Sequence, residues 1–153
     1  MAGDNNMGNK NTLKLDDQLC FAFYACSREI MKLYRPILQD LNLTYTQYIT
    51  MIALWEQDNT TVKDLGQRLY LDSGTLTPLL KKLEAMGLIK RTRDQHDERN
   101  VLITVTPEGR EMEQAANEIP CKLFQDTEVE LEDAKQLHAQ VQNLLNKIGS
   151  KKS

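Results

Sequence analysis

Near the middle of the chain, apolar residues recur at the spacing of two short, adjacent helices. Val62, Leu65 and Leu69 repeat in the first segment. The second segment repeats leucines at Leu76, Leu79, Leu80 and Leu83. Such a repeat lines one face of a helix with side chains that pack against a core. The pattern therefore predicts two amphipathic helices in succession.

Polar residues mark where these two helices begin. Thr61 can cap the first helix, and Asp72 or Ser73 the second, because a short side-chain oxygen accepts hydrogen bonds from the free amides of a first turn. Only the segment 70–72 connects the two helices. Two short helices joined this closely predict a helix-turn-helix, whose second helix enters the major groove of DNA.

A polar hairpin is expected after the second helix. Gly87 can end that helix because glycine reaches left-handed dihedral angles without strain. Residues 88–93 and 101–106 have the composition of two strands, and the second alternates between two faces. The polar segment 94–100 lies between them. A helix-turn-helix followed by a charged β-hairpin is the pattern of a winged helix.

Longer helical repeats lie on both sides of this region. Residues 16–41 form one, in which Pro36 is expected to cause a kink or an interruption. Residues 46–57 form another, with Thr44 or Thr46 as its cap.

Two further helices are expected after the hairpin. Pro107 stands at the favoured first position of one, which we expect to reach about Gln125 with a bend at Pro120. The last helix is expected over 128–148 and carries a wide apolar stripe. No sheet is available to cover that stripe. Packing against the N-terminal helix and a second copy of the chain buries it most simply, and a monomer with a self-contained helical cap is the alternative.

The predicted fold class is mainly α with a small β-hairpin wing (α+β), a winged helix-turn-helix flanked by N- and C-terminal dimerisation helices. We expect a single domain over 1–153. The winged helix-turn-helix occupies about 46–106, the dimerisation helices about 16–45 and 107–149, and a flexible leader 1–14. A two-fold homodimer would place two recognition helices about one DNA turn apart, which matches a palindromic operator in double-stranded DNA.

Charge distribution modifies this picture more than the net charge does. The net charge of −3 argues against binding to nucleic acid, but residues 61–110 hold nine basic and seven acidic residues, so positive charge concentrates in the predicted winged helix.

No run of about 18 apolar residues exists, so no membrane span is expected. The polar N-terminus lacks the apolar core of a secretion signal, which indicates a cytoplasmic protein.

The outward side of the second predicted helix suits DNA. Ser73, Thr75 and Thr77 offer hydroxyls that reach base edges or phosphates, and Lys81 and Lys82 pair with phosphate oxygens. A solvated amphipathic helix without a partner is the alternative interpretation.

The chain contains three cysteines: Cys20, Cys26 and Cys121. An odd number in a chain of cytosolic character argues against a disulfide framework. There is no CxxC pair, and the two histidines, His96 and His138, are far apart in sequence. We therefore expect no metal site and no cofactor.

Four segments resemble MarR-family repressors, and within that family the organic hydroperoxide resistance regulators and their thiol-sensing relatives. The resemblance covers about residues 15–148. The segments are Asp17-Gln-Leu-Cys-Phe-Ala-Phe-Tyr24, Leu43-Thr-Tyr-Thr-Gln-Tyr48, Leu71-Asp-Ser-Gly-Thr-Leu-Thr-Pro-Leu-Leu-Lys81 and Asp97-Glu-Arg-Asn-Val101. The resemblance implies a dimeric winged-helix repressor that releases DNA when one cysteine is oxidised.

The resemblance also implies roles for individual residues. Cys20 matches the sensing cysteine, and Tyr34 and Tyr45 match tyrosines that hydrogen-bond its sulfur, partly from the other subunit, with Tyr24 as a further tyrosine near the cysteine. Cys121 lies in the helix that supplies a second cysteine in some relatives, about one turn early, whereas others use a small thiol. The implied DNA contacts are Asp72, Ser73, Thr75, Thr77, Lys82, Arg91 at a phosphate, and Arg99 in the minor groove braced by Asp97.

The chemistry of Cys20 follows from general principles. A thiolate, not a thiol, attacks a peroxide, and the free amides of a first helical turn stabilise a thiolate. The product is a sulfenic acid that condenses with another thiol or is over-oxidised. The apolar neighbours of Cys20 favour an organic hydroperoxide as the oxidant. The alternatives are a buried, inert Cys20, a repressor released by a small aromatic or lipophilic ligand, and a thiol peroxidase, which we do not expect because no arrangement for turnover is visible.

Overall fold

The computed structural model describes residues 13–149 of the chain. The chain divides into two compact units, with the boundary between Ile119 and Pro120. The predicted leader, 1–14, lies outside the described residues except for Leu13 and Lys14.

The helix-turn-helix is present where the apolar repeat predicts it. It consists of α3 (Val62–Leu69) and α4 (Ser73–Ala85). Thr61 Oγ1 accepts a hydrogen bond from the backbone N–H of Asp64 at 3.1 Å, so it caps α3 as predicted. Asp72, rather than Ser73, caps α4, because its Oδ1 accepts from the backbone N–H of Thr75 at 2.6 Å.

The leucine repeat of α4 forms the centre of the core. Its members are almost fully buried: Leu76, Leu79, Leu80 and Leu83. Between the helices, Tyr70 adopts left-handed dihedral angles, with a φ of 58°, and ends α3. Gly87 ends α4 with a φ of 79°, as expected for a glycine at this position.

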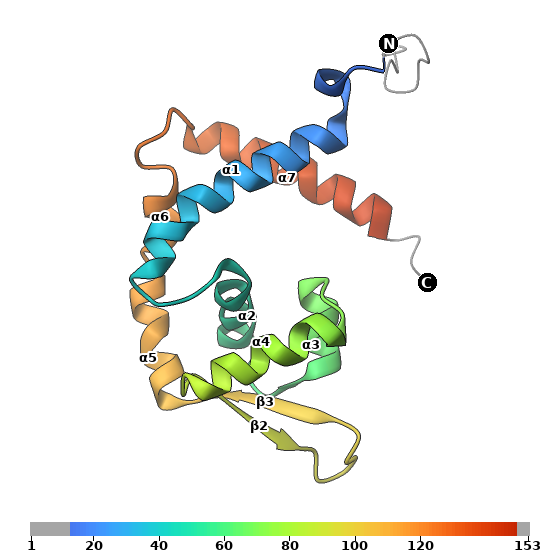
Figure 1. The fold of residues 1–153 in the computed structure, drawn as a ribbon, viewed down its shortest axis with the longest axis vertical. Helices are drawn as coiled ribbons and strands as arrows, with labels where there is room; N and C mark the ends of the chain where they lie inside the picture. The colour runs from blue at the N-terminus through green and yellow to red at the C-terminus, as the bar shows by residue number, and fades with distance from the viewer. Residues whose placement is uncertain (1–12, 150–153) are drawn as a thin grey trace. The chain divides into compact units, whose positions relative to one another are not determined.

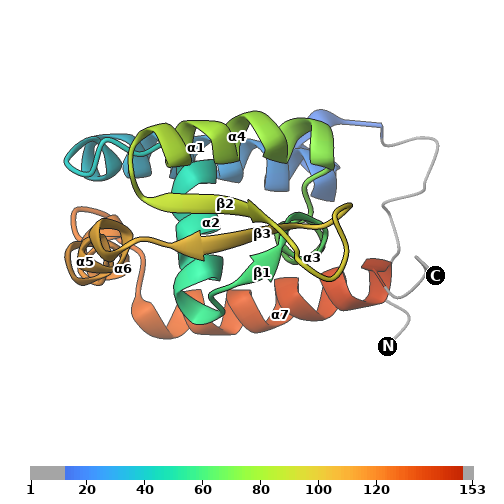
Figure 2. The same cartoon turned by 90° about the horizontal axis from the view of Figure 1, so that it is seen from below.

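The wing is a hairpin of β2 (Ile89–Arg93) and β3 (Val101–Val105). The strands pair antiparallel, from Ile89 opposite Val105 to Arg93 opposite Val101. A third strand, β1 (Thr60–Thr61), pairs with the other side of β3 and was not predicted. Two residues are too few to show strand alternation, so the sequence carries no signal for β1. Within the N-terminal unit, α4 runs alongside the hairpin (Figures 1 and 2).

Helix α2 (Tyr45–Glu56) packs against α3, α4, α5 and β3. Thr44 caps it in a reciprocal arrangement with Gln47: Thr44 Oγ1 accepts from the backbone N–H of Gln47, and Gln47 Oε1 accepts from that of Thr44. This capping box satisfies two amides that the first turn leaves free. Met51 and Leu54 are fully buried on this helix.

Helix α1 (Leu19–Gln39) follows a short 3₁₀ turn, η2 (Leu15–Asp17). The helix is continuous through Pro36, so the proline does not interrupt it. Leu38, near its C-terminal end, is the only described residue of α1 that is buried. Towards the N-terminal end, Leu19, Phe23 and Tyr24 are exposed apolar side chains.

The helix expected from Pro107 to about Gln125 is two helices, which corrects the prediction. Helix α5 (Pro107–Ala116) ends before Pro120, and α6 (Ile119–Leu123) follows. A proline ring clashes with the carbonyl group four residues earlier in a helix, which here belongs to Ala116. The break therefore falls where Pro120 would first disturb a continuous helix, and Pro120 itself stands in the first turn of α6.

In the C-terminal unit, α7 (Leu131–Gly149) begins three residues later than the predicted start at residue 128. None of its described residues is buried, and Leu131, Leu137 and Ile148 are exposed. Its apolar stripe is therefore only partly buried among the described residues. Within residues 13–149, no helix is both long enough and apolar enough to cross a membrane.

Candidate DNA-binding surface and thiol sensor

The start of α4 presents short polar side chains to solvent. Asp72, Ser73 and Thr75 are exposed, whereas Thr77 is half-buried. Hydrogen bonds from Thr75 lower the pKa of Asp72, so its carboxylate is charged while it caps the helix. Lys82, further along α4, is exposed. These residues were predicted to contact DNA, and the surface they form is open to a duplex.

The tip of the wing carries an arginine held by an aspartate. Arg99 Nε donates to Asp97 Oδ1 at 3.1 Å, and Nη2 donates to Oδ2 at 3.3 Å. The backbone N–H of Arg99 donates to the same carboxylate, and these bonds lower the pKa of Asp97. The Arg99 side chain is still 90% exposed. The arginine is thus oriented at one end and available to a partner, as the predicted bracing requires.

Arg91 was expected to contact a phosphate, but in this structure its guanidinium is paired within the protein. Nε and Nη2 both donate to Glu84 Oε1, at 3.1 and 2.9 Å. The pair lies between α4 and β2, and the Arg91 side chain is 27% exposed. The phosphate contact remains a prediction, and the structure gives Arg91 a second role that the sequence did not reveal.

Cys20 is the second residue of α1 and is exposed, which contradicts the alternative of a thiol buried within the chain. Gln18 stands at the N-cap of this helix, and its side chain makes no capping bond to the first turn. Tyr24 lies one helical turn from Cys20. Its ring is 6.2 Å from that of Phe21, and the Arg28 guanidinium lies 5.6 Å from its centre.

Tyr34 and Tyr45 come together with Tyr48 where α1 meets α2. The ring centres of Tyr34 and Tyr45 are 4.9 Å apart, and Tyr48 lies 5.9 Å from Tyr34. Burial, together with the neighbouring phenols, raises the pKa of Tyr34 to about 12. Burial also raises the pKa of Tyr45 and of Tyr48. All three therefore remain hydrogen-bond donors at neutral pH.

The prediction for this cluster did not include Tyr48, although its spacing of three residues from Tyr45 places both on one face of a helix. Within one chain the cluster does not meet Cys20. Tyr34 follows Cys20 by 14 residues on the same helix, which is about 21 Å at the helical rise.

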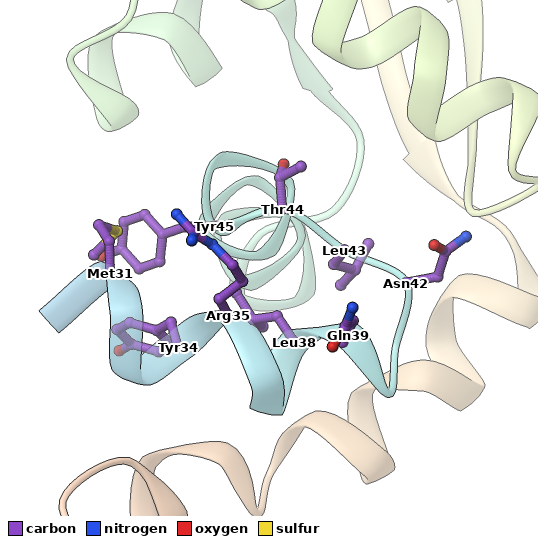
Figure 3. Close-up of a pocket in the computed structure, with 9 residues that line it drawn as sticks. All are labelled: Met31, Tyr34, Arg35, Leu38, Gln39, Asn42, Leu43, Thr44 and Tyr45. Carbon is purple, nitrogen blue, oxygen red and sulfur yellow. The ribbon is translucent and has the colours of Figure 1, made fainter. Parts of the chain in front are cut away.

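A pocket of about 440 Å³ adjoins the tyrosine cluster. Figure 3 shows Tyr34 and Arg35 of α1 and Tyr45 of α2 around it. The remaining lining residues are Met31, Leu38, Gln39, Asn42, Leu43 and Thr44. Its walls combine aromatic and aliphatic surface with one guanidinium.

Two further cysteines are present, Cys26 and Cys121. Cys26 of α1 and Cys121 of α6 are both exposed free thiols. Cys121 belongs to the C-terminal unit. Among residues 13–149, histidine, cysteine and carboxylate side chains form no group that could hold a metal ion.

A helix-turn-helix, a braced wing arginine and flanking helices with exposed apolar side chains are the features of a winged-helix DNA-binding protein. A family model described as "Transcriptional regulator SarA/Rot" matches residues 32–116. The organic hydroperoxide resistance transcriptional regulator of Bacillus subtilis is 47% identical over 139 residues, which is 91% of this chain and 95% of that protein.

Solved structures agree with this match. Reduced AbfR bound to DNA, a protein of Staphylococcus epidermidis, is 34% identical with a TM-score of 0.73, over 88% of this chain and 93% of that one. Disulfide-formed AbfR is 35% identical with a TM-score of 0.66, over 94% and 97%. The chain therefore belongs to the MarR-type winged-helix transcriptional regulators, in the group that includes the organic hydroperoxide resistance regulators. The predictions that it regulates transcription and is not an enzyme are confirmed.

Proposed function

We propose that this chain is a cytoplasmic, homodimeric repressor that binds a palindromic operator and releases it when an organic hydroperoxide oxidises Cys20. The observation that carries the proposal is an exposed thiol in an uncapped first helical turn. The names of its relatives support it, since one is a hydroperoxide resistance regulator and another was solved reduced on DNA and as a disulfide.

Dimerisation is supported by the apolar side chains that α1 and α7 leave exposed. Helix α7 buries none of its described residues, and the N-terminal half of α1 exposes Leu19 and Phe23. Exposed apolar surface of this kind is costly in a monomer and typical of a subunit interface. A two-fold dimer also pairs two recognition helices and two wings, as a palindrome requires.

In such a dimer, the sensing site combines two chains. The resemblance to thiol-sensing regulators implies that Tyr34 and Tyr45 hydrogen-bond the sensing sulfur. Because both lie far from Cys20 along one chain, we assign them to the thiol of the partner subunit, where their protonated hydroxyls donate to the sulfur. Tyr24 lies one turn from Cys20 in the same chain. Donors that favour the thiolate raise the fraction of reactive sulfur.

Oxidation of Cys20 and the fate of its product are separate steps. The Cys20 thiolate attacks one peroxide oxygen, the O–O bond breaks, and the alkoxide takes up a proton to leave as an alcohol. The product is a sulfenic acid. It condenses with a second thiol and releases water, and the thiol is either Cys121 or a low-molecular-weight thiol. Without a second thiol, more hydroperoxide over-oxidises the sulfur.

Operator release is the test of this proposal. DNA duplexes selected by the wild-type chain from a random library are bound to protein and treated with cumene hydroperoxide. We expect Cys20→Ser to bind with wild-type affinity and to stay bound after treatment, whereas Cys26→Ser is released like the wild type. Release of the Cys20→Ser protein would contradict the sensing role.

The pocket beside the tyrosine cluster favours a second candidate function, a repressor released by a small aromatic or lipophilic ligand. The pocket combines aromatic walls with the Arg35 guanidinium, which suits an aromatic acid. Release caused by such a ligand would be reversible on dilution and would leave the number of free thiols unchanged. Release by oxidation consumes at least one thiol.

A further inference from the structure

Glu84 and Arg91 form a close pair between the recognition helix and the wing. Arg91 makes three donations to one carboxylate: its backbone N–H donates to Glu84 Oε2 at 3.0 Å, and Nε and Nη2 donate to Oε1 at 3.1 and 2.9 Å. About two-thirds of each side chain is buried. Bonds between a guanidinium and a carboxylate fix direction as well as distance.

This pair joins the C-terminal end of α4 to the first strand of the wing. Glu84 is the next-to-last residue of α4, and Arg91 is the third residue of β2. Only the turn around Gly87 joins the two elements along the chain, and glycine is the most flexible residue available there. Helix α4 and the hairpin lie side by side (Figure 2). The pair therefore adds a side-chain connection to the burial of Ile89 in the core and the pairing of β3 with β1, and it resists rotation of the wing about its turn.

A winged helix that contacts two grooves of DNA at once needs a fixed orientation of its wing relative to its recognition helix. The hydroxyls near Ser73 lie at one end of α4, and the guanidinium of Arg99 lies at the tip of the hairpin. If the hairpin rotated, Arg99 would have to be reoriented on every encounter with DNA, at a cost in affinity.

From these observations we infer that Glu84 and Arg91 are positioning residues for operator binding, holding the wing at the angle at which Arg99 reaches the minor groove. The inference rests on the proposed DNA-binding function and deepens it. Arg91 then contributes to affinity through Glu84 and not through a phosphate. Its Nε and Nη2 are already used, and the adjacent carboxylate offsets its charge.

The decisive variant is Glu84→Gln, because electrostatics alone and positioning of the wing predict opposite changes in operator affinity. Electrostatics alone predicts tighter binding, since the variant removes a negative charge near DNA. Positioning predicts binding weaker by about tenfold, because a neutral amide cannot replace the ionised acceptor. Glu98→Gln on the exposed wing tip is the matched control, and we expect it to bind as well as or better than the wild type.

Arg91→Lys separates positioning from a phosphate contact. Lysine keeps the positive charge, so a phosphate contact would survive with little loss. Lysine lacks the planar fork, so positioning predicts a loss similar to that of Glu84→Gln. The slope of log Kd against log salt concentration should also remain near the wild-type value, since no phosphate contact is removed.

Combining the variants with Arg99→Ala identifies the mechanism. If the pair acts by presenting Arg99, then Arg99→Ala should cost much less in the Glu84→Gln background than in the wild type, so the effects are not additive. Independent effects would add. Additive costs, undiminished affinity of Glu84→Gln, or wild-type affinity of Arg91→Lys would each overturn the inference.

The measurements use fluorescence anisotropy with the duplex selected by the wild-type chain, well below the melting temperature of every variant. Circular dichroism confirms that the variants are folded. Should Glu84→Gln fail to fold, Arg91→Lys alone and combined with Arg99→Ala decides by the same criteria. If the wild type selects and binds no duplex, the proposed function fails. If the wild type binds and the variants are unaffected, only this inference fails.

Discussion

Replacing Asp58 by asparagine should destabilise the protein in a way that depends on pH. Asp58 follows α2 and joins three segments of the N-terminal unit. Its Oδ1 accepts from the backbone N–H groups of Val105 and Asn59, at 2.9 and 2.7 Å. Its Oδ2 accepts from Arg110 Nη2 at 3.0 Å, and Arg110 Nη1 also donates to the carbonyl oxygen of Trp55 at 3.3 Å.

The magnitude follows from these contacts. An asparagine can keep its oxygen towards the two backbone donors, but its amide group then faces the guanidinium of Arg110, donor against donor. A hydrogen bond between charged groups that are shielded from solvent contributes about 1.5–3 kcal/mol to the free energy of unfolding. Here the side chains of Asp58 and Arg110 are 36% and 41% exposed. Solvent screening therefore reduces the expected cost of Asp58→Asn to about 1–2 kcal/mol at pH 7.

The pH dependence has a definite sign. Burial acts to raise the pKa of Asp58, but hydrogen bonds from Val105, Asn59 and Arg110 outweigh it and leave the pKa below its ordinary value. A carboxyl group with a lowered pKa in the folded state contributes stability above the unfolded pKa, and this is lost as the pH falls through the folded pKa. The variant lacks that contribution at any pH. Its deficit should be complete at pH 7 and should shrink below about pH 4.

Urea unfolding followed by circular dichroism tests this prediction, at one fixed protein concentration because a dimer unfolds in a concentration-dependent way. Asp40→Asn is the control, since no hydrogen bond or ion pair of the Asp40 side chain occurs among residues 13–149. Its stability should match that of the wild type. Equal stability of Asp58→Asn and wild type at pH 7, or an equally large deficit at pH 3, would refute the reasoning.

Three other predictions concern single residues. Gly109→Ala should lower the free energy of unfolding by about 3 kcal/mol or prevent folding, because its methyl group would overlap the Leu88 carbonyl oxygen. The control Gly149→Ala, in open space, should leave the melting temperature unchanged. Equal melting temperatures of Gly109→Ala and the wild type would contradict this prediction. Arg99→Ala should weaken operator binding about tenfold and reduce the salt slope by about one, and an unchanged slope would exclude a contact with DNA. Tyr34→Phe should remove from an absorbance titration one phenol that ionises at about pH 12, because burial raises the pKa of Tyr34 to about 12. If the variant instead lacks a phenol that ionises at the ordinary pH, the Tyr34 hydroxyl is not buried.

The parts of the fold that depend on local rules could be predicted from the sequence. Thr61 and Asp72 cap their helices because a hydroxyl or carboxylate stands just before an apolar repeat, and each needs only its own first turn. Gly87 ends α4 for a similarly local reason. The exposed Arg99 and its brace by Asp97 lie within one hairpin tip.

The missed features depend on contacts between distant segments. Strand β1 exists because β3 offers a free edge, and two residues show no periodicity. The bonds between Arg91 and Glu84 require the turn at Gly87 to fold α4 back along β2, and neither residue is unusual in its own element. Pro120 was expected only to bend one continuous helix, but its ring excludes the carbonyl group four residues earlier, and the chain forms two helices instead.

The central claim, that oxidation of one sulfur releases the operator, is tested most directly in a chain whose single cysteine is Cys20, made by Cys26→Ser and Cys121→Ser. The DNA-bound protein is titrated with cumene hydroperoxide, and anisotropy and intact mass are measured on the same samples. In the presence of a small thiol, we expect release to increase in parallel with the fraction of chains carrying one mixed disulfide, and to be complete at about one equivalent of oxidant per chain. Protein that remains on the operator after Cys20 is fully modified, or protein that leaves with its thiol intact, would contradict the account.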